Sequence, residues 1–164
     1  MASRRESRRH AHIIGWGMAV PERTLTNDEL ATMVDTTDEW IRQRTGIAER
    51  HVAGEGETTL TLSLKAAQSA LEIADLDPIH LGLIIVATIT PEHAFPATAC
   101  LLQDALGSTR AAAFDLAAGC SGFVYGMSLA ADLLAAGSYD FALIVGAETL
   151  SRITNWSDRG TCVL

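Results

Sequence analysis

Apolar residues recur along this chain with two spacings, one typical of amphipathic helices and one typical of buried strands. Over residues 58–74 they return every three or four positions, which predicts a helix with one covered face made by Leu60, Leu64, Ala67, Leu71 and Ala74. Continuous apolar runs at residues 81–88 and 141–145 have the length of strands covered on both faces. The pattern therefore predicts a layered α/β fold built on a parallel sheet.

The segments between these runs continue the alternation of strands and helices. Residues 12–20 and 111–117 are apolar and strand-like, and Pro21 ends the first of them. Residues 97–106 are predicted to form a helix. At the end of the sequence, Gly160-Thr-Cys-Val-Leu164 has the composition of one more strand, with no turn or cap after it. We therefore expect this sequence to be the front part of a longer protein.

Two threonines early in the chain are placed as helix N-caps. Thr26 is followed three positions later by Glu29, and Thr36 is followed in the same way by Glu39. This capping-box spacing predicts that a short helix begins after each threonine. Gly46 is suited to end the second of these helices.

Cys120 stands where the strand at residues 111–117 ends and a long apolar helix begins. That helix is predicted to end at Gly137 and to carry one apolar stripe made by Phe123, Met127, Ala130 and Leu134. Unpaired N–H groups and the positive end of the helix dipole favour the anionic form of a thiol at this position. A thiolate is the nucleophile that acyl transfer needs. Most free cysteines are instead small buried hydrophobic residues, so position alone leaves both interpretations open.

The charge balance narrows the expected partners and compartment. The net charge is −8, although the first nine residues include four basic ones, Arg4, Arg5, Arg8 and Arg9. The rest of the chain is therefore more acidic than the total implies, and nucleic acid is not an expected partner. The sequence has neither the apolar stretch of a secretory signal nor a run of the roughly 20 apolar residues that span a membrane. We expect a cytoplasmic protein with a disordered basic tail at residues 1–11 and a half-domain over residues 12–164.

The cysteines also limit the chemistry. There are three, Cys100, Cys120 and Cys162, widely spaced and without a C-x-x-C pair, which argues against a disulfide framework and against a zinc site. Cys100 is expected in a helix and Cys162 in a strand, where no helix start favours a thiolate. Both are therefore expected to be structural, and no metal is expected.

Several short segments occur together in the order and spacing of one protein family. They are Val34-Asp-Thr-Thr-Asp-Glu-Trp-Ile41, Arg44-Thr-Gly-Ile47, Glu49-Arg-His51, His93-Ala-Phe-Pro96, Phe114 to Phe123 around the cysteine, and Asp158-Arg-Gly-Thr161. Through them the chain, from roughly His12 to Leu164, resembles the N-terminal half of the beta-ketoacyl-acyl-carrier-protein synthase III family. These are the initiating condensing enzymes of type II fatty acid synthesis, in the thiolase-like superfamily. The resemblance implies an α/β, thiolase-like layered fold, with a mixed, mostly parallel sheet and helices on both faces.

The resemblance also implies a reaction. Cys120 would take an acyl group from acetyl-CoA, or from another short acyl-CoA, as a thioester, and its own N–H would form part of the oxyanion hole. Malonyl-acyl carrier protein would then lose CO2 and attack the thioester, with no metal or redox cofactor. A histidine and an asparagine from the C-terminal half would assist, so this chain alone is not expected to perform the full condensation. A homodimer is implied as well.

Further residues carry roles that the resemblance implies. Trp40 and Arg159 would sandwich the adenine of coenzyme A, and Arg44 would contact the nucleotide end. Trp40 and Arg44 lie at i and i+4 on one helix face, where such a pair is more often simple surface packing. Thr36, predicted from the sequence as a helix cap, would also contact coenzyme A. Phe95 would close the acyl pocket of a neighbouring subunit, or is a loop aromatic held by Pro96.

Two alternatives stay open. The chain is a truncated or split half that only binds coenzyme A or pairs with another chain, or the parent protein passes the acyl group to a different nucleophile. The abrupt end of the sequence favours the first alternative, and Cys120 favours catalysis by the parent protein.

Overall fold

The structure, a computed structural model, describes residues 10–163 and divides into two compact units. Residues 10–19 and 59–148 form the sheet unit, and residues 20–58 and 149–163 form the small unit. Most of the predicted basic tail, residues 1–9, lies outside the described residues, and so does Leu164.

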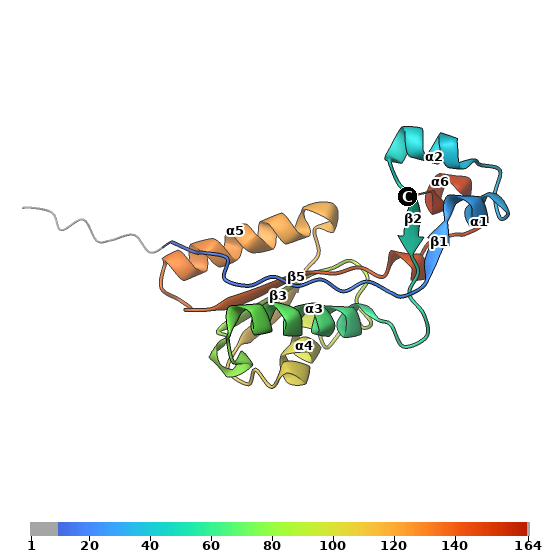
Figure 1. The fold of residues 1–164 in the computed structure, drawn as a ribbon. Helices are drawn as coiled ribbons and strands as arrows, with labels where there is room; N and C mark the ends of the chain where they lie inside the picture. Colours follow the sequence, from blue (N-terminus) through green and yellow to red (C-terminus); the bar gives the residue numbers. More distant parts are fainter. Residues whose placement is uncertain (1–9, 164) are drawn as a thin grey trace, which may run out of the picture. The chain divides into compact units, whose positions relative to one another are not determined.

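A three-stranded parallel sheet forms the centre of the sheet unit (Figure 1). Strand β3 (Leu83–Ala87) lies between β4 (Ala112–Leu116) and β5 (Ala142–Gly146). In this register Leu83 stands opposite both Ala112 and Ala142. All five residues of β3 are buried, as a continuous apolar run predicts. The three predicted strands of this sheet are confirmed.

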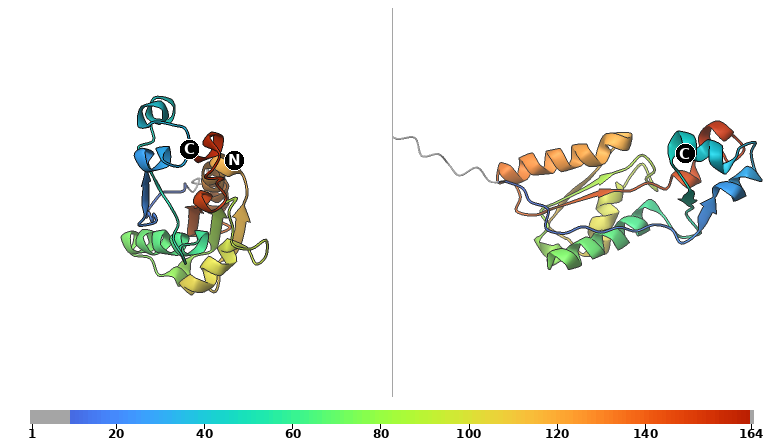
Figure 2. Two further views of the ribbon diagram at one scale, coloured as in Figure 1. Left: turned by 90° about the vertical axis from the view of Figure 1, so that its right-hand side faces the viewer. Right: turned by 45° about the horizontal axis from the view of Figure 1, so that its top comes forward.

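Helices cover both faces of this sheet. α3 (Thr59–Ala74) and α4 (Thr98–Leu106) lie on one face and α5 (Gly122–Ala135) lies on the other (Figures 1 and 2). One hydrophobic cluster joins α3 and α4 to Ile84 and Val86, and another joins α5 to the remaining face of β3. The predicted layered α/β fold is thus observed. Short 3-10 turns are formed by Pro78–His80, Gly119–Ser121 and Leu150–Arg152.

Two glycines let α5 pack closely on the sheet. A Cβ added at Gly122 would lie 3.0 Å from the Cβ of Ala87, and one added at Gly126 would lie 3.1 Å from Cγ2 of Ile144. The covered face of α5 is therefore made by Gly122, Gly126 and Ala130. The predicted stripe shares Ala130 with this face, whereas Phe123, Met127 and Leu134 lie beside the face, and all four residues border a cavity.

The prediction of a paired strand at residues 12–20 is wrong. Residues 10–20 have no regular secondary structure, and within residues 10–163 their backbone makes no hydrogen bond to other backbone groups. The segment instead runs along α3: a Cβ at Gly15 or Gly17 would collide with the carbonyl oxygen of Ala70 or Ala66. A strand needs a neighbouring strand to bond, and the described part of the chain places none beside this segment.

The small unit contains short elements. β1 (Thr24–Thr26) pairs with β2 (Glu49–His51) in antiparallel fashion. α1 (Asn27–Ala31) begins after Thr26, whose side chain accepts a hydrogen bond from the Glu29 amide as predicted. α2 (Asp38–Thr45) ends at Gly46, which adopts the left-handed conformation with φ of 74°. Only glycine adopts this conformation without strain, so this helix end was readable from the sequence.

The predicted strand at residues 160–164 is also wrong within the described residues. Arg159–Cys162 form a helical turn, α6, and Cys162 is buried in it. Asp158 causes this: its carboxylate accepts a hydrogen bond from the Gly160 amide at 2.8 Å, and its carbonyl accepts one from the Cys162 amide. An N-terminal cap of this kind favours a helical turn over an extended strand.

A buried arginine ties the small unit together. Arg50 on β2 donates hydrogen bonds to Oδ1 of Asn27 and to the carbonyl of Val163, both at 2.5 Å. Asn27 in turn donates to Asp38 at 2.7 Å and to the carbonyl of Ile47 at 2.8 Å. Burial lowers the pKa of Arg50, whereas the hydrogen bonds from Asn27 and Arg42 hold the pKa of Asp38 below its usual value. Segments far apart in sequence therefore meet at one guanidinium.

We predict that Arg50→Met lowers the free energy of unfolding by about 3 kcal/mol, because it leaves the buried acceptors of Asn27 and Val163 without donors. The midpoint of urea denaturation measures this change. Arg42→Met is the matched control, since it removes an exposed ion pair with Asp38 and should leave the midpoint nearly unchanged. Equal shifts in the two variants would contradict the importance of the Arg50 bonds.

Candidate active site

Cys120 lies in the 3-10 turn between β4 and α5 and is exposed. Gly119, with φ of 53°, allows the sharp change of direction after the strand. The amide of Ser121 donates to the Ala118 carbonyl, and the amide of Gly122 donates to the Gly119 carbonyl. The Cys120 amide has no such partner within residues 10–163. The structure thus presents an exposed thiol beside an unpaired N–H group, two residues before a 14-residue helix.

The other two cysteines are in different environments. Cys100 lies in α4, and its thiol donates to the carbonyl of Ala113 at 3.6 Å. Cys162 is buried in the small unit. Cys120 is therefore the exposed thiol of the three.

Glu148 organises the neighbouring end of the sheet. Its carboxylate accepts hydrogen bonds from the Ile89 amide at 2.9 Å, from the Thr88 hydroxyl at 3.2 Å and from the Thr90 hydroxyl at 2.5 Å. It thereby joins the segments that follow β5 and β3. Sequence reasoning missed this residue, although an acid soon after a buried strand was a usable signal, because parallel strands end at one edge of their sheet.

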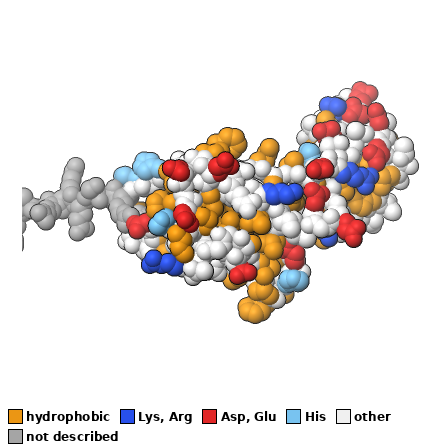
Figure 3. Space-filling model, turned by 60° about the horizontal axis from the view of Figure 1, so that its bottom comes forward, with side chains coloured by type: hydrophobic (Ala, Val, Ile, Leu, Met, Phe, Trp, Pro, Cys, Tyr) orange, Lys and Arg blue, Asp and Glu red, His pale blue; other side chains and the backbone are white. Residues whose placement is uncertain are grey.

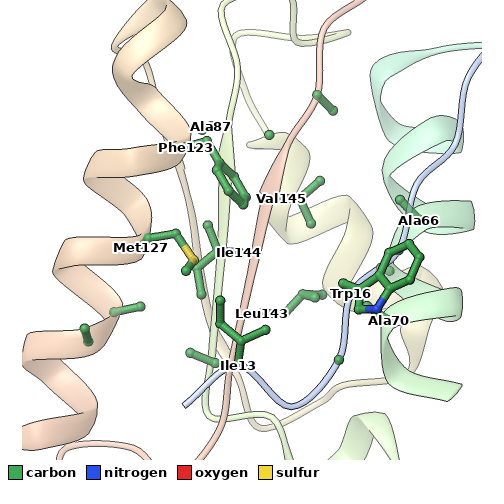
Figure 4. Close-up of a pocket in the computed structure, with 18 of the residues that line it drawn as sticks. Ile13, Trp16, Ala66, Ala70, Ala87, Phe123, Met127, Leu143, Ile144 and Val145 are labelled. Carbon is green, nitrogen blue, oxygen red and sulfur yellow. The ribbon is translucent and has the colours of Figure 1, made fainter. Parts of the chain in front are cut away.

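Cys120 and Glu148 both line an apolar cavity of about 870 Å³ in the sheet unit. Figure 4 shows Phe123 and Met127 reaching from α5 toward β5, with Trp16 beside Ala66 and Ala70 of α3.

In the small unit, the structure brings three predicted residues together. The guanidinium of Arg159 lies 4.0 Å from the centre of the Trp40 ring, and that of Arg44 lies 4.3 Å from it. Arg44 also donates to the carbonyl of Trp40 at 3.4 Å, one turn back along α2. Cation–π contacts of this kind hold flat cationic groups against an indole. The two arginines provide positive charge directly beside an aromatic surface.

The prediction that Thr36 caps the second helix is wrong by one residue. Thr37 has the extended backbone of an N-cap, and its hydroxyl accepts a hydrogen bond from the Trp40 amide at 3.1 Å. Glu39 stands three positions after Thr36, whereas Trp40 stands three positions after Thr37, so the capping-box spacing favoured the wrong threonine. The Thr36 hydroxyl is buried and has no hydrogen-bond partner within the described part of the chain.

Phe95 and Arg42, two other positions singled out from the sequence, lie at the protein surface. Phe95 lies in the loop between β3 and α4 with 88% of its surface exposed. Arg42 is paired through Nε with Asp38 at 2.8 Å, one turn away on α2.

Across residues 10–163, no group of three or more His, Cys, Asp or Glu side chains is placed to hold a metal ion. In the same residues, no helix has the length and hydrophobicity needed to cross a bilayer.

A layered α/β unit whose strand β4 leads into a cysteine turn defines a protein of the thiolase-like class. The chain belongs to the 3-oxoacyl-[acyl-carrier-protein] synthase III family, because curated relatives are more than 50% identical over 94% of it. The family model itself matches residues 114–164. The beta-ketoacyl-[acyl-carrier-protein] synthase III of Xylella fastidiosa (strain 9a5c) is 56% identical over 155 residues, covering 94% of this chain and 48% of that protein.

Two further relatives agree with this assignment. The synthase III of Roseiflexus sp. (strain RS-1) is 53% identical over 94% of this chain and 47% of its own length. The crystal structure of 3-oxoacyl-[acyl-carrier-protein] synthase III from Aquifex aeolicus VF5 matches with a TM-score of 0.90 and 47% identity, over 93% of this chain and 49% of that chain. The chain therefore spans about half the length of the curated relatives it matches.

We predict that Glu148→Ala loosens the segment after β3, because the Ile89 amide and the buried Thr88 hydroxyl lose their acceptor. Each unpaired group costs roughly 1–3 kcal/mol, so amide hydrogen exchange at Ile89 should become about tenfold faster or more. Glu148→Gln keeps one acceptor oxygen and should have a smaller effect. Unchanged exchange at Ile89 in Glu148→Ala would contradict this role.

Proposed function

We propose that this chain is the acyl-accepting part of a beta-ketoacyl-acyl-carrier-protein synthase III, which begins fatty acid synthesis from a short acyl-CoA. The observation that carries the proposal is the Cys120 turn, with an exposed thiol and an unpaired amide at the start of α5. The family model matches this same stretch.

The first half-reaction uses groups within this turn. The Cys120 thiolate attacks the thioester carbonyl of acetyl-CoA, and the carbonyl oxygen becomes an oxyanion. The unpaired Cys120 N–H is suited to donate to that oxyanion. When the tetrahedral intermediate collapses, the bond to the coenzyme A sulfur breaks. Coenzyme A leaves as its thiolate, which takes up a proton, and the acyl group stays on Cys120 as a thioester.

The small unit is proposed to bind the nucleotide end of coenzyme A. The Trp40 ring would stack on adenine after the Arg159 guanidinium, which lies 4.0 Å from the ring centre, moves away to form the other side of the sandwich. Arg44 supplies positive charge beside it for phosphate groups. A polar contact from Thr36 to coenzyme A is part of the proposal only because the family resemblance implies it, since its hydroxyl is buried. Aromatic and guanidinium planes together are suited to stack on a base.

The second half-reaction belongs to the whole protein. Malonyl-acyl carrier protein would lose CO2, and the resulting carbanion equivalent would attack the Cys120 thioester to give a beta-ketoacyl product. The histidine and asparagine expected to assist this step are not in this chain, so the isolated chain should stop at the acyl-enzyme. The proposal further includes a cytoplasmic homodimer in which Phe95 reaches the acyl pocket of its neighbour, and no resident cofactor or metal.

We predict that the chain, incubated with radiolabelled acetyl-CoA, becomes labelled on Cys120. The label should be absent from Cys120→Ala and unchanged in Cys100→Ala, because Cys100 lies in a helix interior and bonds to Ala113. Peptide mapping by mass spectrometry locates the acyl group. Label that persists in Cys120→Ala would sink the catalytic assignment. Binding of coenzyme A without any acylation would favour the non-catalytic alternative.

We also predict that Trp40→Ala weakens coenzyme A binding by roughly five- to a hundredfold, since base stacking on an aromatic side chain contributes about 1–3 kcal/mol. Arg159→Ala should weaken it in the same direction. Isothermal titration calorimetry gives the dissociation constants. Arg42→Ala is the control on the same helix, because Arg42 pairs with Asp38 and does not contact the Trp40 ring. Equal affinities in all three variants would refute the site.

A further inference from the structure

A shallow groove of about 650 Å³ lies between the C-terminal ends of α3 and α4. Its apolar lining comes from both helices and from the turn after α3, and consists of Leu71, Leu76, Pro78, Ala105 and Leu106. Three exposed carboxylates border it, those of Glu72, Asp75 and Asp77. We call this feature the acidic groove. It suits a basic segment, because arginine stems cover apolar surface while their charged ends stay in water.

The groove lies at an edge of the sheet unit where negative charge accumulates. α3, α4 and α5 each lead into a strand of the parallel sheet, so all three helices end at the edge where the strands begin. The C-terminal end of a helix carries partial negative charge, which basic side chains stabilise. None of these three helices, all within residues 10–163, has a basic residue in its last turn, whereas Glu72 and Asp104 stand near the ends of α3 and α4.

The described part of the chain does not balance the charge of the groove. Within residues 10–163, no lysine, arginine or histidine forms an ion pair with Glu72, Asp75 or Asp77. Asp77 accepts a hydrogen bond from the Ile79 amide, which is a neutral partner. Figure 3 shows acidic side chains among hydrophobic ones at the left-hand end of the sheet unit. A cationic partner would relieve the repulsion between these carboxylates.

The N-terminal segment of the chain runs toward this same edge. A Cβ at Gly17 would collide with the carbonyl oxygen of Ala66, and one at Gly15 would lie 3.0 Å from the Cβ of Ala74. Residues 10–19 therefore lie along α3 with their lower numbers toward the C-terminal end of that helix. Residues 1–9 are joined to this end of the segment, and their charged side chains are those of Arg4, Arg5, Glu6, Arg8 and Arg9.

The length of residues 1–9 is sufficient to reach the groove. Ala11 and His12 line the same cavity as Leu134 of α5, on the other side of the sheet from α3. Packed layers of helix and sheet lie about 10 Å apart, so the path from α5 to the α3 layer is about 20 Å. Nine extended residues span up to about 30 Å.

We propose that the acidic groove is the docking site of this chain's own residues 1–9. The guanidinium groups of the segment pair with Glu72, Asp75 and Asp77, and their alkyl stems cover the apolar lining. Docking holds residues 10–19 against α3 from their free end, which matters because this segment has no backbone-to-backbone hydrogen bond within residues 10–163. The proposal does not involve acyl transfer by Cys120.

Covalent linkage favours this occupant over a basic segment of another molecule. Both would offer the same guanidinium groups to the same carboxylates. A segment joined to its site by a short flexible link is present there at an effective concentration in the millimolar range. A separate chain would have to reach a similar concentration in solution to compete.

The test uses the full 164-residue chain with Arg5→Lys and Arg8→Lys, which keep the charge and add two amines. A carbodiimide joins an amine to a carboxylate in contact with it, and peptide mapping of the monomer by mass spectrometry locates the bond. At about 10 mM NaCl the new lysines should couple to Glu72, Asp75 or Asp77. At about 1 M NaCl, where the screening length is about 3 Å instead of about 30 Å, coupling should fall at least about fivefold.

Thermal unfolding provides a second measurement with a matched control. Replacing the four arginines of residues 1–9 with glutamine should lower the unfolding midpoint by about 2–4 °C at about 10 mM NaCl and leave it unchanged at about 1 M. In a Glu72→Gln, Asp75→Asn background the same replacement should have little effect, because its partners are already gone. Asparagine tolerates the positive φ of 49° at Asp75, so this background should fold. Asp132→Asn on α5 is the control and should leave the full effect.

Several outcomes would overturn the proposal. Coupling that is absent, or that goes mainly to Asp132, would mean that residues 1–9 do not occupy the groove. Coupling found only in covalent dimers would make a second copy the occupant. An equal effect of the arginine replacement with and without Glu72→Gln and Asp75→Asn would place the contacts of the arginines elsewhere.

Discussion

The burial of β3 is the constraint on which the sheet unit depends. All five of its residues are covered by neighbouring strands on both edges and by helices on both faces. A strand in this position has every backbone group bonded and no side chain in water, so its place in the fold is fixed. Its direction then fixes the direction of β4 and β5, because both pair with it in parallel register.

That parallel arrangement gathers the chemistry at one edge of the sheet. β3 ends before Thr88, β4 ends before the Cys120 turn, and β5 ends before Glu148. Residues separated by up to 60 positions therefore meet where the three strands stop. The close approach of α5, which Gly122 and Gly126 permit, holds the start of this helix against the end of β3. The thiol is positioned by the packing of the sheet as much as by its local turn.

The sequence correctly predicted those helices and strands that are determined by residues within or next to the element itself. This holds for the apolar runs that form β3 and β5, for the helical spacing of apolar residues in α3, and for the glycine that ends α2. The structure confirms each of these predictions. The residues of the Trp40 cluster were found through the family motifs, and α2 with α6 brings them together. The cap was predicted at Thr36 and lies at Thr37, because the capping-box spacing to Glu39 favoured the wrong one of two adjacent threonines. The turn at Arg159–Cys162 was missed because Asp158 overrides the strand-like composition that follows it.

The error at residues 12–20 has a different origin. The composition of this segment is that of a strand, yet the structure gives it no hydrogen-bonded neighbour within residues 10–163. β-propensity describes how a segment fits a pleated surface, and it takes effect only when a partner strand is present. Gly15 and Gly17 instead bring the segment so close to α3 that a side chain at either position would collide with the helix backbone. The position of the segment in the described residues is therefore explained by its packing against α3 and not by its β-propensity.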